Sequence, residues 1–338
     1  MSKAEVQMVE VTYEEAGARL DRWVKRRLSV TQGQVEKLLR TGQIRVDGAR
    51  AKANTRLEIG QIVRLPPVQR PQPKANWESS KPTRNDPDAQ FIKNLVLYED
   101  EDIIALNKPH GLAVQGGTKT PRHIDGMLGH LQNGEHRPRL IHRLDRDTSG
   151  VLVVAKHPAA AARLGDLFKG RDLDKIYWAV TVTVPNPPFG QVRCWMAKGT
   201  GGLGADGNPT DRERMYRSAQ GVDGARHSVT DYAVISTAGR RAAWVALKPQ
   251  TGRMHQLRLH MSELDSSILG DHKYATRREA PQGVGKGMHL HARALILPRK
   301  RGKPITLTAP LPKHMKETFE ALGFLESEAG NDPLAPFV

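Results

Sequence analysis

The sequence predicts an α+β protein, in which a small N-terminal α/β module precedes a larger domain with a mixed, mostly antiparallel central sheet and flanking helices. In the larger domain, short β-rich runs follow one another closely and helical runs are few, which is typical of such a sheet. The N-terminal region carries two apolar patterns with the three-to-four spacing of one-sided helices. A polar stretch rich in Pro, Lys, Asn, Ser and Asp separates the two regions. We expect four segments: the module at 1–65, a linker at 66–90, the larger domain at 91–325 and a tail at 326–338.

The N-terminal module is expected to contain two helices and a small β portion. Apolar residues recur at helical spacing over 20–28 and again over 35–39, so each stretch can bury one face. A β-type alternation then precedes the pair Asp47-Gly48, a dipeptide that strongly favours a hairpin turn. Between residues 19 and 56, eleven Lys and Arg side chains stand against three acidic ones, which predicts a basic surface.

The larger domain is expected to alternate strands with few helices. The β-branched run from Val151 to Ala155 predicts a buried strand, and Ala159–Phe168 predicts a helix. The stretch 198–224, rich in Gly, Asp and Arg, is expected to be an exposed loop or a hairpin insertion, and the tail to be loosely held. Further strands are expected at 95–98, 103–106, 176–184, 229–235, 243–247 and 294–297.

Composition narrows the classes of function. The 338 residues carry a net charge of +16, which favours a polyanionic partner. The single cysteine, Cys194, cannot form a disulfide within one chain and fits a reducing compartment. Without a Cys-x-x-Cys pair, zinc ribbons and zinc-dependent base deaminases are not expected. Neither an apolar N-terminal core nor a membrane-length apolar stretch is present, so we expect a cytoplasmic protein without membrane association.

The most informative stretch is RLIHRLDRDTSGVLVVAK at residues 139–156. Asp145 lies between Arg143 and Arg146, and a polar turn leads from it into the apolar strand. A carboxylate is thereby presented at the mouth of a rigid strand, where cations hold it in the charged form that a nucleophile requires. For an isolated Asp, the alternative is an ordinary surface salt bridge. The remaining motifs favour the nucleophile.

Five motifs, taken together, resemble the RluA-type pseudouridine synthases over residues 91–325. Asn107-Lys108-Pro109 and the Ala-Val-Gln-Gly-Gly at 113–117 are most similar to the large-subunit ribosomal branch of that family. The stretches RLDRWVKRRL, VEKLLRTGQIRVDG and RLEIGQIVRL resemble the alpha-L RNA-binding module, which is shared with a small-subunit ribosomal protein. The insertion near 199–224 has no counterpart in the pattern. In chain order, the five motifs are Arg-Leu-Asp within HRLDRDTSG, Lys-x-Tyr within DKIYWAV, GRMHQLRLH, LGDHKYA and LHA.

The resemblance implies the pseudouridine synthase fold and the isomerisation of uridine within large-subunit ribosomal RNA, without a cofactor. It implies that Asp145 is the nucleophile, that Arg253 pairs with it, and that Tyr177 stacks under the uracil. Whether Asp145 attacks the sugar, adds to the base or abstracts a proton stays open. The alternatives are a phosphate-binding role for Arg253 and a core role for Tyr177. His289 and His291 share a strand face, but no carboxylate or thiol clearly joins them, so no metal is expected.

The same resemblance implies contacts with RNA. A base hidden in folded RNA must be turned out of its stack, and Arg143 is implied to fill the gap. His142 either helps Arg143 or is a packed structural residue. Arg258 and Lys273 are implied phosphate contacts, with solvated surface cations as the alternative. In the N-terminal module, the implied RNA-binding residues are Arg22, Arg26, Lys37 and Arg40.

Two other functions stay open. One is a non-catalytic RNA-binding or ribosome-assembly protein, against which the intact set of Asp145, Tyr177 and Arg253 argues. The other is the same chemistry on transfer RNA. In each case RNA is the expected partner, and we expect the protein to act as a monomer.

Overall fold

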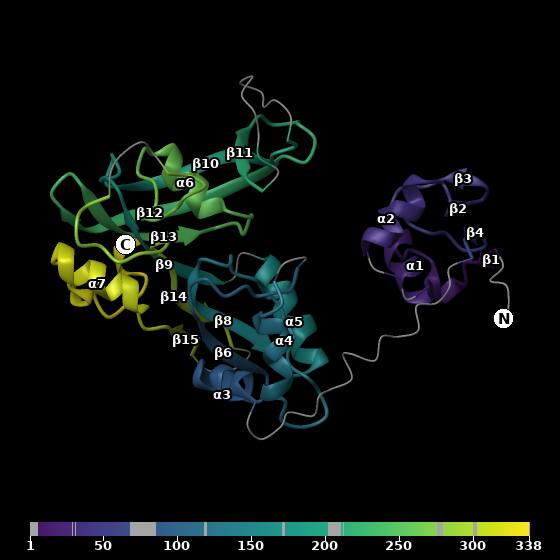
Figure 1. Ribbon diagram of the computed structural model, residues 1–338, viewed down its shortest axis with the longest axis horizontal. Coiled ribbons are helices and arrows are strands. Elements are labelled where there is room, and N and C mark those ends of the chain that lie inside the picture. Colours follow the sequence, from purple (N-terminus) through teal and green to yellow (C-terminus); the bar gives the residue numbers. More distant parts are fainter. Residues whose placement is uncertain are drawn as a thin grey trace. The chain divides into compact units, whose positions relative to one another are not determined.

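The chain forms two compact units, Met1–Thr83 and Arg84–Val338 (Figure 1). Within the described ranges, no helix combines the length and apolar character that crossing a bilayer requires. Most of the expected linker, 68–85, lies outside the described residues. The computed structural model describes residues 6–28, 30, 32–67, 86–117, 120–170, 173–201, 211, 213–275, 280–299 and 303–337.

The first unit is a small module in which two helices and a four-stranded sheet share one core. Helices α1 (Leu20–Leu28) and α2 (Gln32–Arg40) bury the apolar faces predicted from their periodicity. Asp47 and Gly48 join two strands with φ angles of 49° and 78°, so the predicted hairpin turn is confirmed. The sheet order is β1-β4-β2-β3, with β1 (Gln7–Glu10), β2 (Arg45–Val46), β3 (Ala49–Arg50) and β4 (Ile62–Leu65).

The second unit is built on an 11-stranded sheet, in the order β11-β10-β12-β13-β9-β14-β8-β6-β5, with β15 pairing with β14 and β7 with β8. The pairing of β14 with β8 is parallel, and the other described pairs are antiparallel. The predicted mixed, mostly antiparallel sheet is therefore confirmed. Its strands are β5 (Val96–Glu99), β6 (Ile103–Lys108), β7 (Arg139–Leu140), β8 (Ser149–Ala155), β9 (Asp174–Thr181), β10 (Phe189–Lys198), β11 (Met215–Ser218), β12 (Arg226–Ala238), β13 (Ala242–Pro249), β14 (Leu290–Leu297) and β15 (Ile305–Thr308).

Five helices flank this sheet in the described residues, and one of them changes a predicted boundary. Helix α3 begins inside the expected linker, because the Asp86 side chain accepts the Asp88 N–H at 2.9 Å and Pro87 fits the first turn. Helix α5 matches its predicted position, whereas α3, α4, α6 and α7 were not predicted. The helices are α3 (Pro87–Asn94), α4 (Ile124–Met127), α5 (Pro158–Lys169), α6 (Gln256–Glu263) and α7 (Lys313–Leu322).

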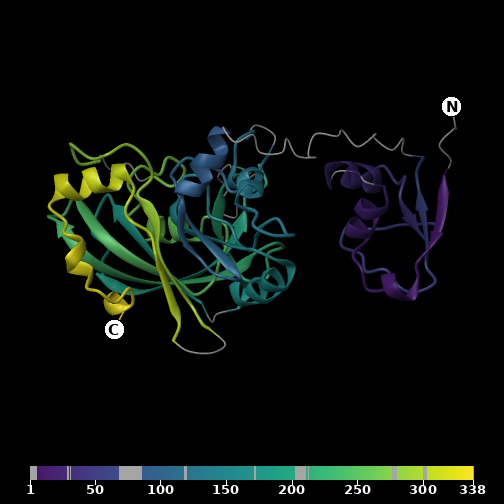
Figure 2. The same cartoon turned by 90° about the horizontal axis from the view of Figure 1, so that it is seen from below.

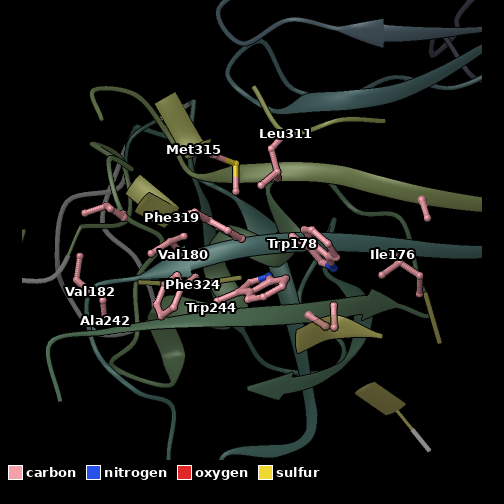
Figure 3. Packing of buried hydrophobic residues seen from close by; sticks show 14 residues of the cluster. Ile176, Trp178, Val180, Val182, Ala242, Trp244, Leu311, Met315, Phe319 and Phe324 are labelled. Carbon is pink, nitrogen blue, oxygen red and sulfur yellow. The ribbon is translucent and has the colours of Figure 1, made fainter. Parts of the chain in front are cut away.

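The C-terminal segment covers one face of β9 and β13. The rings of Trp178 and Trp244 pack edge to face with their centroids 4.7 Å apart, and Phe319 of α7 packs on both (Figure 3). Figure 2 shows α7 and the turns beyond it lying against the green strands. The expectation that the tail is loosely held is wrong. The Phe337 side chain packs on this cluster, and a 3-10 turn spans Glu326–Ala329.

Candidate active site

A loop between β7 and β8 presents Asp145, and a buried lysine holds this loop in place. Lys108, at the end of β6, is fully buried, and its Nζ donates to the carbonyls of Pro109, Leu112 and Arg146 at 2.9, 2.8 and 2.9 Å. Burial lowers the pKa of Lys108 to about 7, against the opposing effect of two nearby aspartates. Because one acceptor belongs to residue 146, the lysine fixes the backbone directly after Asp145.

The turn that follows Asp145 requires glycine where it enters the sheet. Gly150 has a φ of 107°, and a Cβ atom there would lie 2.2 Å from the carbonyl oxygen of Ala292 on the parallel strand β14. Beside it, the Ser149 hydroxyl lies 2.8 Å from Nδ1 of His291. This close pairing of β8 with β14 sets the position from which the Asp145 loop projects.

Asp145 faces the start of helix α6. Its Oδ2 lies 3.9 Å from Nη1 of Arg258 and 3.8 Å from Nε2 of His255, while its side chain stays 25% exposed. Arg258 is almost fully buried, and its Nε and Nη2 each lie 2.6 Å from Asp271. Burial would raise the pKa of Asp271, but the hydrogen bonds and charge of Arg258 outweigh it and hold that pKa low. Asp271 therefore fixes the guanidinium whose third nitrogen faces the partly open carboxylate.

Tyr177, on β9, lies near Asp145 in largely apolar surroundings. Burial, and in second place the charge of Asp145, raise the pKa of Tyr177 well above its ordinary value. Its hydroxyl therefore stays protonated at neutral pH and is poorly suited to act as a base. A half-buried aromatic ring beside a carboxylate fits the stacking role expected for Tyr177.

The expected pairing of Arg253 with Asp145 is wrong, because Arg258 faces that carboxylate instead. Arg253 is exposed, and its Nε donates to the carbonyl of His227 at 3.3 Å, with no ion pair to Asp145 among the described contacts. The reason is that Arg253 precedes helix α6, whereas Arg258 lies on its buried side. Arg258, expected to contact phosphate, lies beside Asp145 instead. Its burial and its bonds to Asp271 leave it unavailable to RNA phosphate.

The two residues just before the Asp145 turn have different environments. Nε2 of His142 accepts the Val153 N–H at 2.9 Å, and its ring stacks on Phe168 at 4.1 Å. Burial lowers the pKa of His142 to about 3, so the ring is neutral and packed. This packing favours the structural alternative for His142, and its help in RNA binding stays a prediction. Arg143 is exposed and makes no hydrogen bond or ion pair in the part of the chain that the structure describes, so it is free to meet RNA.

The other expected RNA contacts lie on the surface. Lys273 is 23% exposed and its Nζ lies 2.9 Å from Glu213. In the N-terminal module, Arg22 on α1 and Lys37 and Arg40 on α2 are exposed. The side chain of Arg26 lies outside the described atoms.

The ring nitrogens of His289 and His291, considered above as metal ligands, have hydrogen-bond partners within the protein. His289 lies 2.9 Å from the carbonyl of Gly287 and 2.7 Å from the Thr318 hydroxyl, and the second nitrogen of His291 lies 3.2 Å from a carbonyl. Burial lowers the pKa of His289 to about 4. Across the described residues, no cluster of His, Cys, Asp or Glu side chains is arranged to hold a metal ion.

Four further residues of the site lie within the motifs but were not assigned a role from sequence. His255 and Asp271 bracket Arg258, Tyr274 contacts His255, and Lys108 holds the loop. Their residue types gave no signal, because each acts through a neighbour that only the fold supplies.

A family model described as RNA pseudouridylate synthase matches residues 102–263, and one described as S4 domain matches residues 18–63. A Rickettsia bellii protein named ribosomal large subunit pseudouridine synthase C is 34% identical over 306 residues, covering 88% of this chain and 95% of the relative. The mitochondrial pseudouridylate synthase RPUSD4 of Mus musculus is 36% identical, covering 70% and 71%. The solved structure of human RNA pseudouridylate synthase domain containing 4 has a TM-score of 0.57 at 32% identity, covering 70% of this chain and 95% of that one.

Proposed function

Because this chain belongs to the RNA pseudouridylate synthase family and is thus an isomerase, we propose that it converts specific uridines of large-subunit ribosomal RNA to pseudouridine, with Asp145 as the catalytic carboxylate. The rickettsial relative, named as a large-subunit ribosomal enzyme, supports this choice of RNA. The observation that carries the role of Asp145 is its partly exposed carboxylate, backed by the buried Arg258.

The geometry supports different roles for the two residues: Asp145 reacts with the uridine, and the ring of Tyr177 stacks on its uracil. Nη1 of Arg258 lies 3.9 Å from Oδ2 of Asp145, and the carboxylate, 25% exposed, stays open to a substrate. A uridine turned out of its stack can lie on the ring of Tyr177. The bond from C1′ to N1 breaks, the uracil turns, and a bond from C1′ to C5 forms. The C5 proton then leaves and N1 takes up a proton, so that the product is an isomer of uridine. The exposed Arg143 can occupy the gap in the RNA stack.

We also propose that the protein acts as a monomer. Asp145, Tyr177, Arg258 and Asp271 all come from one chain, so a single copy carries this set. The cytoplasmic location expected from sequence stays a prediction.

Tritium release from ribosomal RNA transcripts carrying label at uridine C5 tests this proposal. Wild-type enzyme should release tritium, and Asp145→Asn should not, because the amide lacks the negative charge at nearly the same shape. Asp174→Asn is the matched control, since this aspartate lies 2.8 Å from Lys248 and is 37% exposed. Equal release by wild type and Asp145→Asn would refute the role of Asp145. Release from transfer RNA alone would refute the ribosomal substrate.

A further inference from the structure

The ring of His255 lies between Asp145 and Tyr274. His255 is the residue before α6, in a left-handed conformation with φ of 52°, a region in which His and Asn occur more often than most residues. Its Nε2 lies 3.8 Å from Oδ2 of Asp145, and its Nδ1 lies 3.1 Å from the Tyr274 hydroxyl. The side chain is 11% exposed and meets Tyr274 edge on. Both nitrogens of one ring therefore have assigned neighbours, one of them the proposed reactive group.

The hydroxyl of Tyr274 sets which nitrogen of His255 carries the proton. This hydroxyl oxygen accepts the backbone N–H of Met215 at 2.7 Å, so its own proton is free to be donated to Nδ1 of His255. Burial raises the pKa of Tyr274 to about 12, so the donor is kept. Burial also lowers the pKa of His255, which favours the neutral ring. A neutral imidazole that accepts at Nδ1 carries its hydrogen at Nε2, the nitrogen that faces Asp145.

We propose that His255 is a positioning residue for Asp145, whose Nε2–H orients the carboxylate together with Arg258, and that Tyr274 fixes the tautomer that makes this possible. The proposal rests on the proposed function. At 3.8 Å the contact is longer than a hydrogen bond, as catalytic contacts often are before substrate binds. Arg258 and His255 both approach Oδ2 most closely, so Oδ1 is the less constrained oxygen.

The same contacts connect the unmatched insertion to the reactive carboxylate. Met215 opens β11, which lies in the stretch 198–224 and pairs with β10 of the main sheet, so this stretch contributes one strand of the expected hairpin. From this hairpin the guanidinium of Arg214 lies 4.8 Å from the Tyr274 ring centre, and Glu213 pairs with Lys273 at 2.9 Å. The hairpin thus holds Tyr274, and through Tyr274 and His255 it acts on Asp145. The charged groups that influence His255 are Asp145, Arg258, Lys273 and Asp271.

Tyr274→Phe tests the tautomer directly, because it removes the hydroxyl and little else. At about pH 8 the single-turnover rate should fall about tenfold, the loss that one hydrogen bond can cause. The deficit should shrink once the pH falls below the pKa of His255, which burial holds under its ordinary 6.5, because a protonated imidazole donates from both nitrogens. Tyr232→Phe is the matched control, since this buried tyrosine donates to the Pro187 carbonyl at 3.0 Å and should keep the wild-type rate. A wild-type rate in Tyr274→Phe, or a loss equal at every pH, would overturn the proposal.

Two replacements of His255 separate positioning from folding. The amide nitrogen of Gln reaches the place of Nε2, so His255→Gln should retain most of the rate. His255→Asn tolerates the left-handed backbone but is too short, so it should lose about tenfold. In the His255→Gln background, adding Tyr274→Phe should cost less than about twofold, because no tautomer remains to be fixed. Additive losses, or equal losses in the Gln and Asn variants, would refute the positioning role. An inactive wild type would instead refute the proposed function.

Discussion

Replacing Asp271 by Asn should cost the second unit about 3–5 kcal/mol of unfolding free energy, because it leaves a buried guanidinium without its charged partner. The side chains of Arg258 and Asp271 are 4% and 0% exposed, and two contacts of 2.6 Å join them. The carboxylate also accepts the backbone N–H groups of Lys273 and Tyr274 at 2.9 and 3.1 Å. An amide cannot accept from all these donors at once, so the loss exceeds that of a single neutral hydrogen bond.

Urea unfolding of the full chain, followed by tryptophan fluorescence, measures this cost. Of the described tryptophans, Trp178 and Trp244 report on the core of the second unit. Asp174→Asn, which breaks the more exposed pair with Lys248, should cost only about 0–1 kcal/mol. Substitution of both Arg258 and Asp271 by apolar residues should recover part of the loss, because no unpaired charge stays buried. Equal costs for Asp271→Asn and Asp174→Asn would refute the reasoning.

Three further predictions follow from burial, backbone and exposure. Burial lowers the pKa of His260 and His289 from 6.5 to about 4, so as the pH falls the unfolded chain binds protons before the folded chain does. The thermal unfolding midpoint should therefore be highest above about pH 6.5 and should fall as the pH drops toward about 4, and a midpoint that is constant over this range would contradict this. Gly150→Ala should cost about 2 kcal/mol or more, because its Cβ meets the Ala292 carbonyl, and an unchanged midpoint would contradict this. Arg143→Ala should leave the thermal unfolding midpoint unchanged but reduce the salt dependence of RNA binding by about one counterion. An unchanged salt slope would count against contact between Arg143 and RNA.

Local sequence signals predicted the parts of the fold that local interactions determine. The helices of the N-terminal module follow from apolar spacing, and the β2–β3 turn follows from Asp47-Gly48, whose conformation needs no distant partner. The run Val151–Ala155 was predicted as a strand from its continuous apolar residues, and the strand is indeed buried on both faces. Helix α6 escaped prediction because residues 256–261 are all buried, which removes the one-sided pattern that marks a helix.

The site could be predicted as a set of motifs but not as a set of contacts. Asp145 and Tyr177 were identified from their motifs, and the structure brings them near each other. Sequence spacing could not decide between Arg253 and Arg258, because the choice depends on where α6 begins and on the distant Asp271. For the same reason, the packing of His142 on Phe168 was open until α5 was in place.

Pseudouridine mapping of large-subunit ribosomal RNA tests the central claim most directly. Cells that lack this chain would be complemented with wild type, Asp145→Asn or the control Asp174→Asn, each at matched protein level. We predict that specific pseudouridines disappear without the chain and return with wild type and Asp174→Asn, but not with Asp145→Asn. Restoration of those pseudouridines by Asp145→Asn would contradict the claim that this carboxylate carries out the isomerisation.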